Sequence, residues 1–152
     1  MIFCREMKKF KASTTLVAAI KGFEGYTSKP YKCAGGRWTI GYGHTRNVTA
    51  RMRVTPEAAH RLLMQDLRIV EGKVNALGVC KTQGQFDALC DFAFNLGCGA
   101  LEESTLLFMI RRNAQESMIR AQFERWVRAG GKICPGFVKR RAWEADRYFE
   151  EE

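Results

Sequence analysis

Residues 20–45 read IKGFEGYTSKPYKCAGGRWTIGYGHT and join the end of an amphipathic helix to a β-hairpin. Leu16, Ile20 and Phe23 recur at intervals of four and three residues, which is typical of one apolar helix face. Glu24 follows Ile20 by four residues and therefore lies beside that face. A carboxyl partly withdrawn from water resists ionisation, as a general acid requires, although a lone glutamate at a helix end is more often simply solvated.

The second half of this stretch alternates as a β-strand does. Its residues divide between two faces, with Trp38, Ile40 and Tyr42 on one and Thr39, Gly41 and Gly43 on the other. Two glycines on one face indicate that another group approaches the backbone there. Thr39 has the only hydroxyl on this face and could hold a water or a sugar hydroxyl, although an edge hairpin with a β-favouring threonine would show the same pattern.

Other segments extend this pattern into a family resemblance. They are residues 23–25, 39–45, 85–89, 94–97, 104–107, 126–132 and 140–144. In this order they resemble the phage-type lysozymes, endolysins that hydrolyse the glycan strands of bacterial peptidoglycan, and the similarity runs from about residue 13 to 149. The resemblance implies an α+β, mostly helical, lysozyme-like fold in a single domain, residues 1–152. Its parts are a small active-site lobe with a β-hairpin (about 13–55), a connecting helix (about 55–76) and a helical lobe (about 77–152).

The resemblance also implies a catalytic set. The family has a glutamate, usually an aspartate nine residues later, and a threonine six residues after that. These positions hold Glu24, Cys33 and Thr39 here. By resemblance, Glu24 protonates the departing glycosidic oxygen while a water positioned by Thr39 attacks the sugar carbon from the opposite side, with inversion. The implied bond is the β-1,4 link between N-acetylmuramic acid and N-acetylglucosamine, cleaved without metal or organic cofactor.

Cys33 departs from the family pattern. An aspartate would be ionised at neutral pH, whereas a free thiol, with a pKa near 8.5, is mostly neutral there. Lys29, Lys32 and Arg37 would lower that pKa if they approached the sulfur. A weak base, a polar spacer, a thiolate and a loop residue without a catalytic part all remain open. The alternative function is therefore a lysozyme-like protein that binds glycan with little or no cleavage.

Further residues are assigned to the substrate cleft by the resemblance. They are Gly41, Tyr42, His44 and Asn95. His44 is expected to brace the hairpin through hydrogen bonds near Glu24, and Asn95 either caps a helix end or lines the cleft. Cys33 and His44 could also form the nucleophile and base of a wall peptidase, but the sequence shows no third residue to orient them.

Start signals predict five more helices. They are residues 55–76 from Thr55-Pro56-Glu57, a helix opened by Thr82 with Gln85, residues 104–110 from Ser104, residues 115–127, and residues 137–149. The second of these should turn Phe86, Leu89, Cys90, Ala93 and Phe94 inward.

Composition agrees with one domain of this size. The chain has 152 residues, of which 46% are apolar, and a formal net charge of +9. Such a charge attracts peptidoglycan carboxylates, but it attracts nucleic acid too, and solubility explains it equally well. A nucleic-acid binder is thus the rival class. No RNA-binding or helix-turn-helix motif is recognisable, however, so we expect no nucleic acid to bind.

Six cysteines lie at positions 4, 33, 80, 90, 98 and 134. No pair has CxxC spacing, and His44 and His60 alone give weak support for a zinc site. We expect most of the cysteines to be reduced, small core residues, as Cys90 would be between Phe86 and Phe94.

The stretch most similar to a targeting segment lies near the N-terminus. Basic residues (Arg5, Lys8, Lys9 and Lys11) precede five apolar residues, 16–20, which are too few for a signal-peptide core or a membrane span. The sequence therefore predicts a monomer, without stable membrane association, made in the host cytoplasm. By resemblance it would reach peptidoglycan after a separate phage protein permeabilises the membrane.

Overall fold

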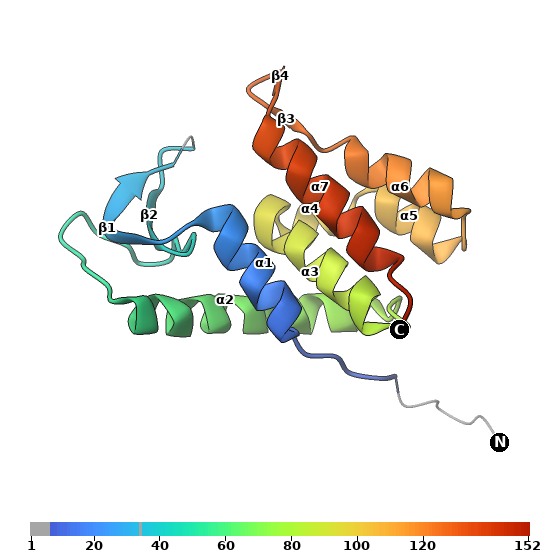
Figure 1. The fold of residues 1–152 in the computed structure, drawn as a ribbon, viewed down its shortest axis with the longest axis horizontal. Coiled ribbons are helices and arrows are strands. Elements are labelled where there is room, and N and C mark those ends of the chain that lie inside the picture. Colours follow the sequence, from blue (N-terminus) through green and yellow to red (C-terminus); the bar gives the residue numbers. More distant parts are fainter. Residues whose placement is uncertain (1–6, 34) are drawn as a thin grey trace. The chain divides into compact units, whose positions relative to one another are not determined.

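The computed structural model describes residues 7–33 and 35–152 (Figure 1). Cys4 and Arg5 of the sequence predictions lie outside these residues. In chain order the elements are α1 (Thr14–Glu24), β1 (Thr27–Lys32), β2 (Trp38–Gly41), α2 (Pro56–Leu77), α3 (Gln83–Leu96), α4 (Cys98–Glu102), α5 (Thr105–Arg111), α6 (Glu116–Glu124), β3 (Arg128–Ala129), β4 (Lys132–Ile133) and α7 (Pro135–Tyr148). The predicted α+β, mostly helical architecture is confirmed.

The chain divides into two compact units. The small unit, residues 14–69, contains α1, the β1–β2 hairpin and the first part of α2. The helical unit, residues 7–13 with 70–152, contains the end of α2 and the later elements. Within the helical unit α7 packs along α3 and against α6 (Figure 1).

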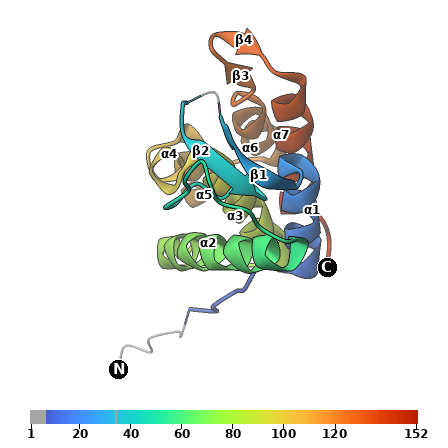
Figure 2. The same cartoon turned by 90° about the vertical axis from the view of Figure 1, so that its left-hand side faces the viewer.

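The β1–β2 hairpin fixes which side chains share a face. The strands are antiparallel (Figure 2), and Tyr31 stands opposite Thr39. The alternation predicted as far as Gly43 is wrong at its end, because β2 stops at Gly41. Residues 41–43 form a tight turn, closed by the Ile40 N–H to His44 O hydrogen bond of 2.9 Å and its reciprocal of 3.0 Å. Positive φ angles of 66° at Gly41 and 77° at Gly43 explain why glycine occupies both positions.

The predicted inward face of α3 is confirmed. Phe86, Leu89, Cys90 and Ala93 are buried, and Phe94 is half-buried. The helix starts also agree with their caps, since the Thr82 hydroxyl accepts from Gln85 N–H at 3.1 Å and the Ser104 hydroxyl accepts from Leu107 N–H at 3.0 Å. Cap chemistry therefore located these helices from local sequence alone.

Some element boundaries differ from the predictions, and one helix was not predicted. The helix expected over 115–127 ends at Glu124, and the short hairpin β3–β4 follows, turned by Gly130 and Gly131 at positive φ. The short helix α4 was not predicted, and α7 starts two residues before the expected Phe137. Among the described residues, no helix is both long enough and apolar enough to span a membrane.

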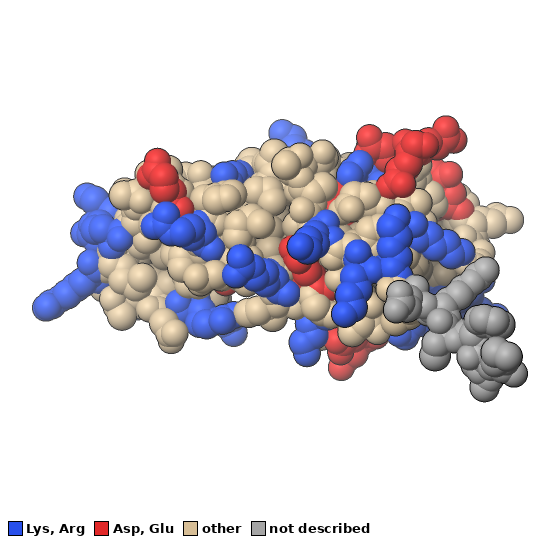
Figure 3. Space-filling view, turned by 90° about the horizontal axis from the view of Figure 1, so that it is seen from below, with Lys and Arg blue, Asp and Glu red and all other residues tan. Residues whose placement is uncertain are grey.

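Charge is unevenly divided between the units. Residues 14–69 hold nine basic and three acidic side chains, a net charge of +6 out of the +9 of the whole chain. Figure 3 shows lysine and arginine side chains scattered over one face of the molecule among uncharged residues.

Candidate active site

Glu24 is the last residue of α1. Leu16 and Ile20 are fully buried, which anchors the helix, and Gly25 ends it at a φ of 68° with its N–H bonded to Lys21 O. The half-buried Glu24 carboxyl lies against the backbone of Gly43, where an added Cβ would come within 2.8 Å of Oε2. The group expected to approach the backbone at the two glycines is therefore, at Gly43, the Glu24 carboxyl itself.

Cys33 follows β1 in a tight turn. Its N–H donates to Arg37 O at 2.9 Å, and Gly36 N–H donates back to Cys33 O at 2.8 Å. The pKa of the thiol is lowered, first by hydrogen bonds from the backbone N–H groups of Arg37 and Gly35 and then by the Thr39 hydroxyl. The cationic side chains expected to lower this pKa are not its cause; the Lys32 ammonium instead lies 5.2 Å from the centre of the Trp38 ring.

Thr39 connects the two strands of the site. It is buried in β2, and its hydroxyl lies 3.3 Å from Arg37 O as well as within hydrogen-bonding reach of the Cys33 sulfur. One hydroxyl proton can serve either acceptor, so Thr39 can donate to a thiolate and accept from a water in turn. The small unit therefore places the second and third members of the predicted set side by side.

Tyr31 is a site residue that the sequence analysis missed. It faces Thr39 across the hairpin, and its side chain is 40% exposed. Burial raises the pKa of its phenol, and the negative charges of Glu24 and Cys33 raise it further. The phenol therefore lies near both groups. The signal was available in the sequence, because Tyr31 precedes Cys33 by two residues and so shares its strand face.

His44 is buried and braces the small unit as expected. Its Nδ1 lies 2.8 Å from Asp66 Oδ2, and its Nε2 lies 2.8 Å from Arg46 O. A carbonyl oxygen only accepts, so Nε2 is the donor to Arg46. Asp66, on α2, was not singled out in the sequence, where nothing distinguishes it from a surface acid.

The remaining predicted cleft residues are placed differently. Gly41 is buried, and a Cβ added to it would lie only 3.1 Å from the Cβ of Ala59. Tyr42 is half-buried beside the Tyr26 ring, with centroids 5.7 Å apart. Asn95 belongs to the helical unit, where its side-chain oxygen accepts a hydrogen bond of 2.7 Å from Arg141. Their contacts with substrate stay predictions.

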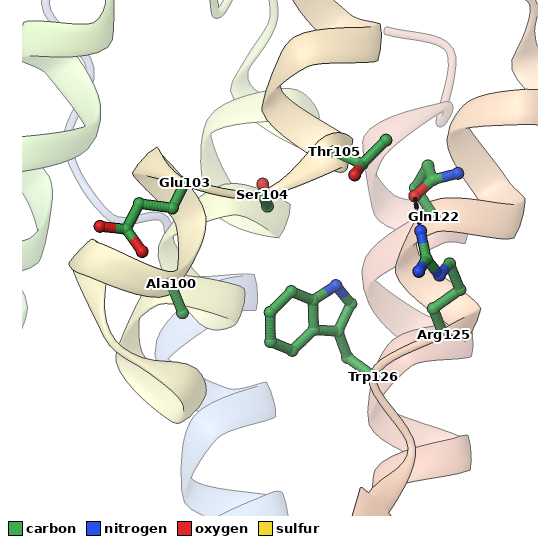
Figure 4. A pocket seen from close by; sticks show the side chains of 7 residues that line it. All are labelled: Ala100, Glu103, Ser104, Thr105, Gln122, Arg125 and Trp126. Carbon is green, nitrogen blue, oxygen red and sulfur yellow. Dashed lines mark hydrogen bonds between the residues drawn. The ribbon is translucent and has the colours of Figure 1, made fainter.

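The helical unit has a hollow of its own, of about 540 Å³ (Figure 4). Its lining residues are Ala100, Glu103, Ser104, Thr105, Gln122, Arg125 and Trp126. Arg125 donates a hydrogen bond of 3.1 Å to Gln122 on one side, and the Trp126 indole faces the space. None of the predicted site residues lines this hollow. Its mixture of charge, amide, hydroxyl and indole suits a polar ligand.

No group of three or more His, Cys, Asp or Glu side chains in the described parts of the chain is arranged to hold a metal ion.

Comparison with known proteins shows which family the chain resembles. The phage lysozyme family model matches residues 21–144. The endolysin of Bacillus phage PZA is 42% identical over 129 residues, which are 82% of this chain but only 50% of that protein. The endolysin of Acyrthosiphon pisum secondary endosymbiont phage 1 is 40% identical over 130 residues, covering 82% of this chain and 88% of its own.

A solved structure agrees with these relatives. The muramidase domain of SpmX from Asticaccaulis excentricus superposes with a TM-score of 0.84 at 34% identity, over 93% of this chain and 99% of that domain. The sequence relatives and the structural neighbour thus agree on the family and on the fold. The chain belongs to the phage lysozyme family.

Proposed function

We propose that the protein is a muramidase that hydrolyses the β-1,4 bond between N-acetylmuramic acid and N-acetylglucosamine in bacterial peptidoglycan. The observation that carries this proposal is the Glu24 carboxyl held against Gly43 in the unit that also pairs Cys33 with Thr39. A general acid and a separate base or anion are the two groups that glycoside hydrolysis requires. Membership in the phage lysozyme family supports the choice of substrate.

In the proposed mechanism, Glu24 gives its proton to the departing glycosidic oxygen. A water molecule hydrogen-bonded to Thr39 attacks the anomeric carbon from the opposite face. Its proton passes to the Cys33 thiolate, so that the new carbon–oxygen bond forms with inversion. Afterwards the thiol returns its proton to solvent, and Glu24 takes one up. No covalent glycosyl intermediate is needed.

The lowered pKa of Cys33 favours the thiolate among the roles left open by the sequence. Backbone N–H groups aimed at the sulfur stabilise its anion without any cationic neighbour. A thiolate supplies the negative charge that the family's usual aspartate would bring. These features favour glycan cleavage over glycan binding without cleavage.

Two further proposals concern access and assembly. The protein acts as a monomer, and it reaches the wall from the host cytoplasm after another phage protein permeabilises the membrane. Lysis of intact cells would then require a permeabilising agent, whereas purified walls would be cleared directly.

The products of digestion test the proposed reaction. Purified peptidoglycan should yield new reducing ends on N-acetylmuramic acid, and the first-formed anomer, followed by proton NMR, should be α. New reducing ends on N-acetylglucosamine, or new amino groups from peptide cleavage, would contradict the proposed bond.

A further inference from the structure

Two tyrosines of the small unit are exposed to the same degree but differ in their hydroxyl groups. Tyr26 is 39% exposed and Tyr31 is 40% exposed. The Tyr26 hydroxyl donates to Val54 O at 2.7 Å, and its ring packs beside that of Tyr42. The Tyr31 hydroxyl bonds to no residue in the described part of the chain. Tyr26 is therefore engaged in holding the fold, whereas Tyr31 has a donor to offer.

The register of the hairpin sets where Tyr31 points. Residues directly opposite each other in an antiparallel pair carry their side chains on the same face, and Tyr31 is opposite Thr39. Cys33, two residues beyond Tyr31, continues that face, and its N–H still bonds across the hairpin to Arg37. Tyr31 thus shares a face with the two groups proposed to handle the attacking water.

Electrostatics place the phenol on the Glu24 side as well. After burial, the charges of Glu24 and Cys33 are the causes that raise the pKa of Tyr31 above its ordinary value of 10.0. The phenol therefore keeps its proton throughout the neutral range and is always able to donate. A partly exposed aromatic ring with a hydroxyl donor at its edge complements a pyranose sugar, which has an apolar C–H face surrounded by hydroxyl oxygens.

We propose that Tyr31 is a substrate-binding residue of the cleavage site. Its ring packs against one face of the sugar beside the scissile bond, and its hydroxyl donates a hydrogen bond to an oxygen of that sugar. This role rests on the proposed muramidase function, because it requires a glycan between Glu24 and Cys33.

The test measures binding separately from cleavage. In the Glu24→Gln background, the affinity for soluble peptidoglycan strands freed of cross-links is measured by calorimetry. Tyr31→Phe should weaken binding about fivefold, the value of one neutral hydrogen bond. Tyr31→Ala should weaken it about tenfold further, because the ring is lost too. Tyr26→Phe is the matched control and should lower the melting temperature while leaving the affinity unchanged.

Steady-state kinetics with the same strands and an intact Glu24 provide a second readout. Tyr31→Phe should raise KM more than it lowers kcat, since the contact is already made to bound substrate. Unchanged affinity in both Tyr31 variants, or no binding by the Glu24→Gln parent, would overturn the inference. Absence of new N-acetylmuramic acid reducing ends with the wild-type enzyme would instead contradict the proposed function, whereas the binding measurement would still report on Tyr31.

Discussion

Cys33 is the residue that distinguishes the proposed mechanism from that of a site with an aspartate, because its thiolate is proposed to accept the proton of the attacking water. The backbone N–H groups of Arg37 and Gly35, and then the Thr39 hydroxyl, lower the pKa of this thiol, so the turn after β1 favours its ionisation. Because the pKa lies below the ordinary thiol value, the anion is present at neutral pH in a larger fraction than in an exposed cysteine.

Substitution of Cys33 tests its role as base. Cys33→Ala should slow hydrolysis of purified walls by about 10²–10⁴-fold, as expected for loss of a general base, and Cys33→Asp should retain or raise activity. In the wild type, activity should rise as pH increases through the lowered cysteine pKa, and this limb should move to pH below about 5 in Cys33→Asp. Wild-type lysis by a folded Cys33→Ala protein would contradict this role.

Alkylation provides an independent check on the same anion. Iodoacetamide should inactivate the wild type and leave Cys33→Asp active. Burial raises the pKa of Cys80 to about 12 and also raises that of Cys90, so these thiols should react slowly and serve as internal controls. Mass spectrometry of the labelled protein would identify the modified residue; first labelling at Cys80 or Cys90 would be inconsistent with a Cys33 thiolate.

The family's spacing pointed to part of the candidate site and not to the rest. Glu24, Cys33 and Thr39 stand at fixed intervals in the sequence, and the small unit holds all three. Tyr31 acquires its place only when the hairpin register pairs it with Thr39. Asp66 acquires its partner His44 across 22 residues, and no local pattern predicts that contact.

At the scale of elements, a buried charge cluster joins α3 to α7. Arg140 binds Asp91 through two hydrogen bonds of 2.9 and 2.8 Å, and Arg141 donates to Glu144 Oε1 at 2.8 Å. Burial raises the pKa of Glu144 well above its ordinary value, and the negative charge of the neighbouring Asp91 raises it further. Glu144 Oε2 is buried without a hydrogen-bond partner in the described part of the chain, so the folded state favours the neutral, protonated carboxyl.

This proton makes stability depend on pH. Above about pH 4.3 the unfolded chain releases the Glu144 proton while the folded chain holds it, so this group lowers the free energy of unfolding as pH rises towards the raised pKa. Glu144→Gln keeps an acceptor for Arg141 and is uncharged at every pH. Its stability relative to wild type should therefore increase between pH 5 and pH 8 in urea unfolding.

A control separates loss of charge from loss of contact. Glu144→Ala removes one acceptor of the buried Arg141, which keeps its bond to Asn95, and should cost about 1–3 kcal/mol, the usual cost of a lost hydrogen bond at a buried group. If wild type and Glu144→Gln showed the same pH slope, a raised pKa of Glu144 in the folded state would be excluded.

Elements with strong end signals were predictable, and those defined by short-range turns were not. Thr55, Thr82 and Ser104 marked the starts of α2, α3 and α5 because a cap acts locally. The end of α6 depends on the β3–β4 hairpin, and a strand of two residues leaves too short a pattern to recognise. Likewise, Gly43 resembled a strand residue until its positive φ placed it in a turn.

At the scale of the whole molecule, the excess positive charge is concentrated in the unit that holds the proposed catalytic set. If this charge attracts the enzyme to an anionic wall, activity should fall as the Debye length contracts from about 10 Å at 0.1 M salt to about 3 Å at 1 M. Activity that does not change with salt would indicate that the charge serves solubility instead. Binding of duplex DNA that survives physiological salt would favour the nucleic-acid-binding class.

Matched charge reversals locate the effect. The double variant Arg51→Glu/Arg53→Glu lowers the charge of the small unit, and Arg111→Glu/Lys139→Glu lowers that of the helical unit equally; all four side chains are exposed. The first variant should lose more activity at low salt, and the two should converge at 1 M. Equal losses at low salt would show that only the net charge matters.

The central claim is that Glu24 is the general acid of a peptidoglycan hydrolase. The most direct test is the release of N-acetylmuramic acid reducing ends from purified walls by Glu24→Gln, with folding checked by circular dichroism. The amide keeps the shape against Gly43 but has no proton to give, so release should fall by about 10²–10⁴-fold or more. Glu57→Gln, an exposed glutamate of the same unit, should retain wild-type activity. Near-normal release by folded Glu24→Gln would contradict the account.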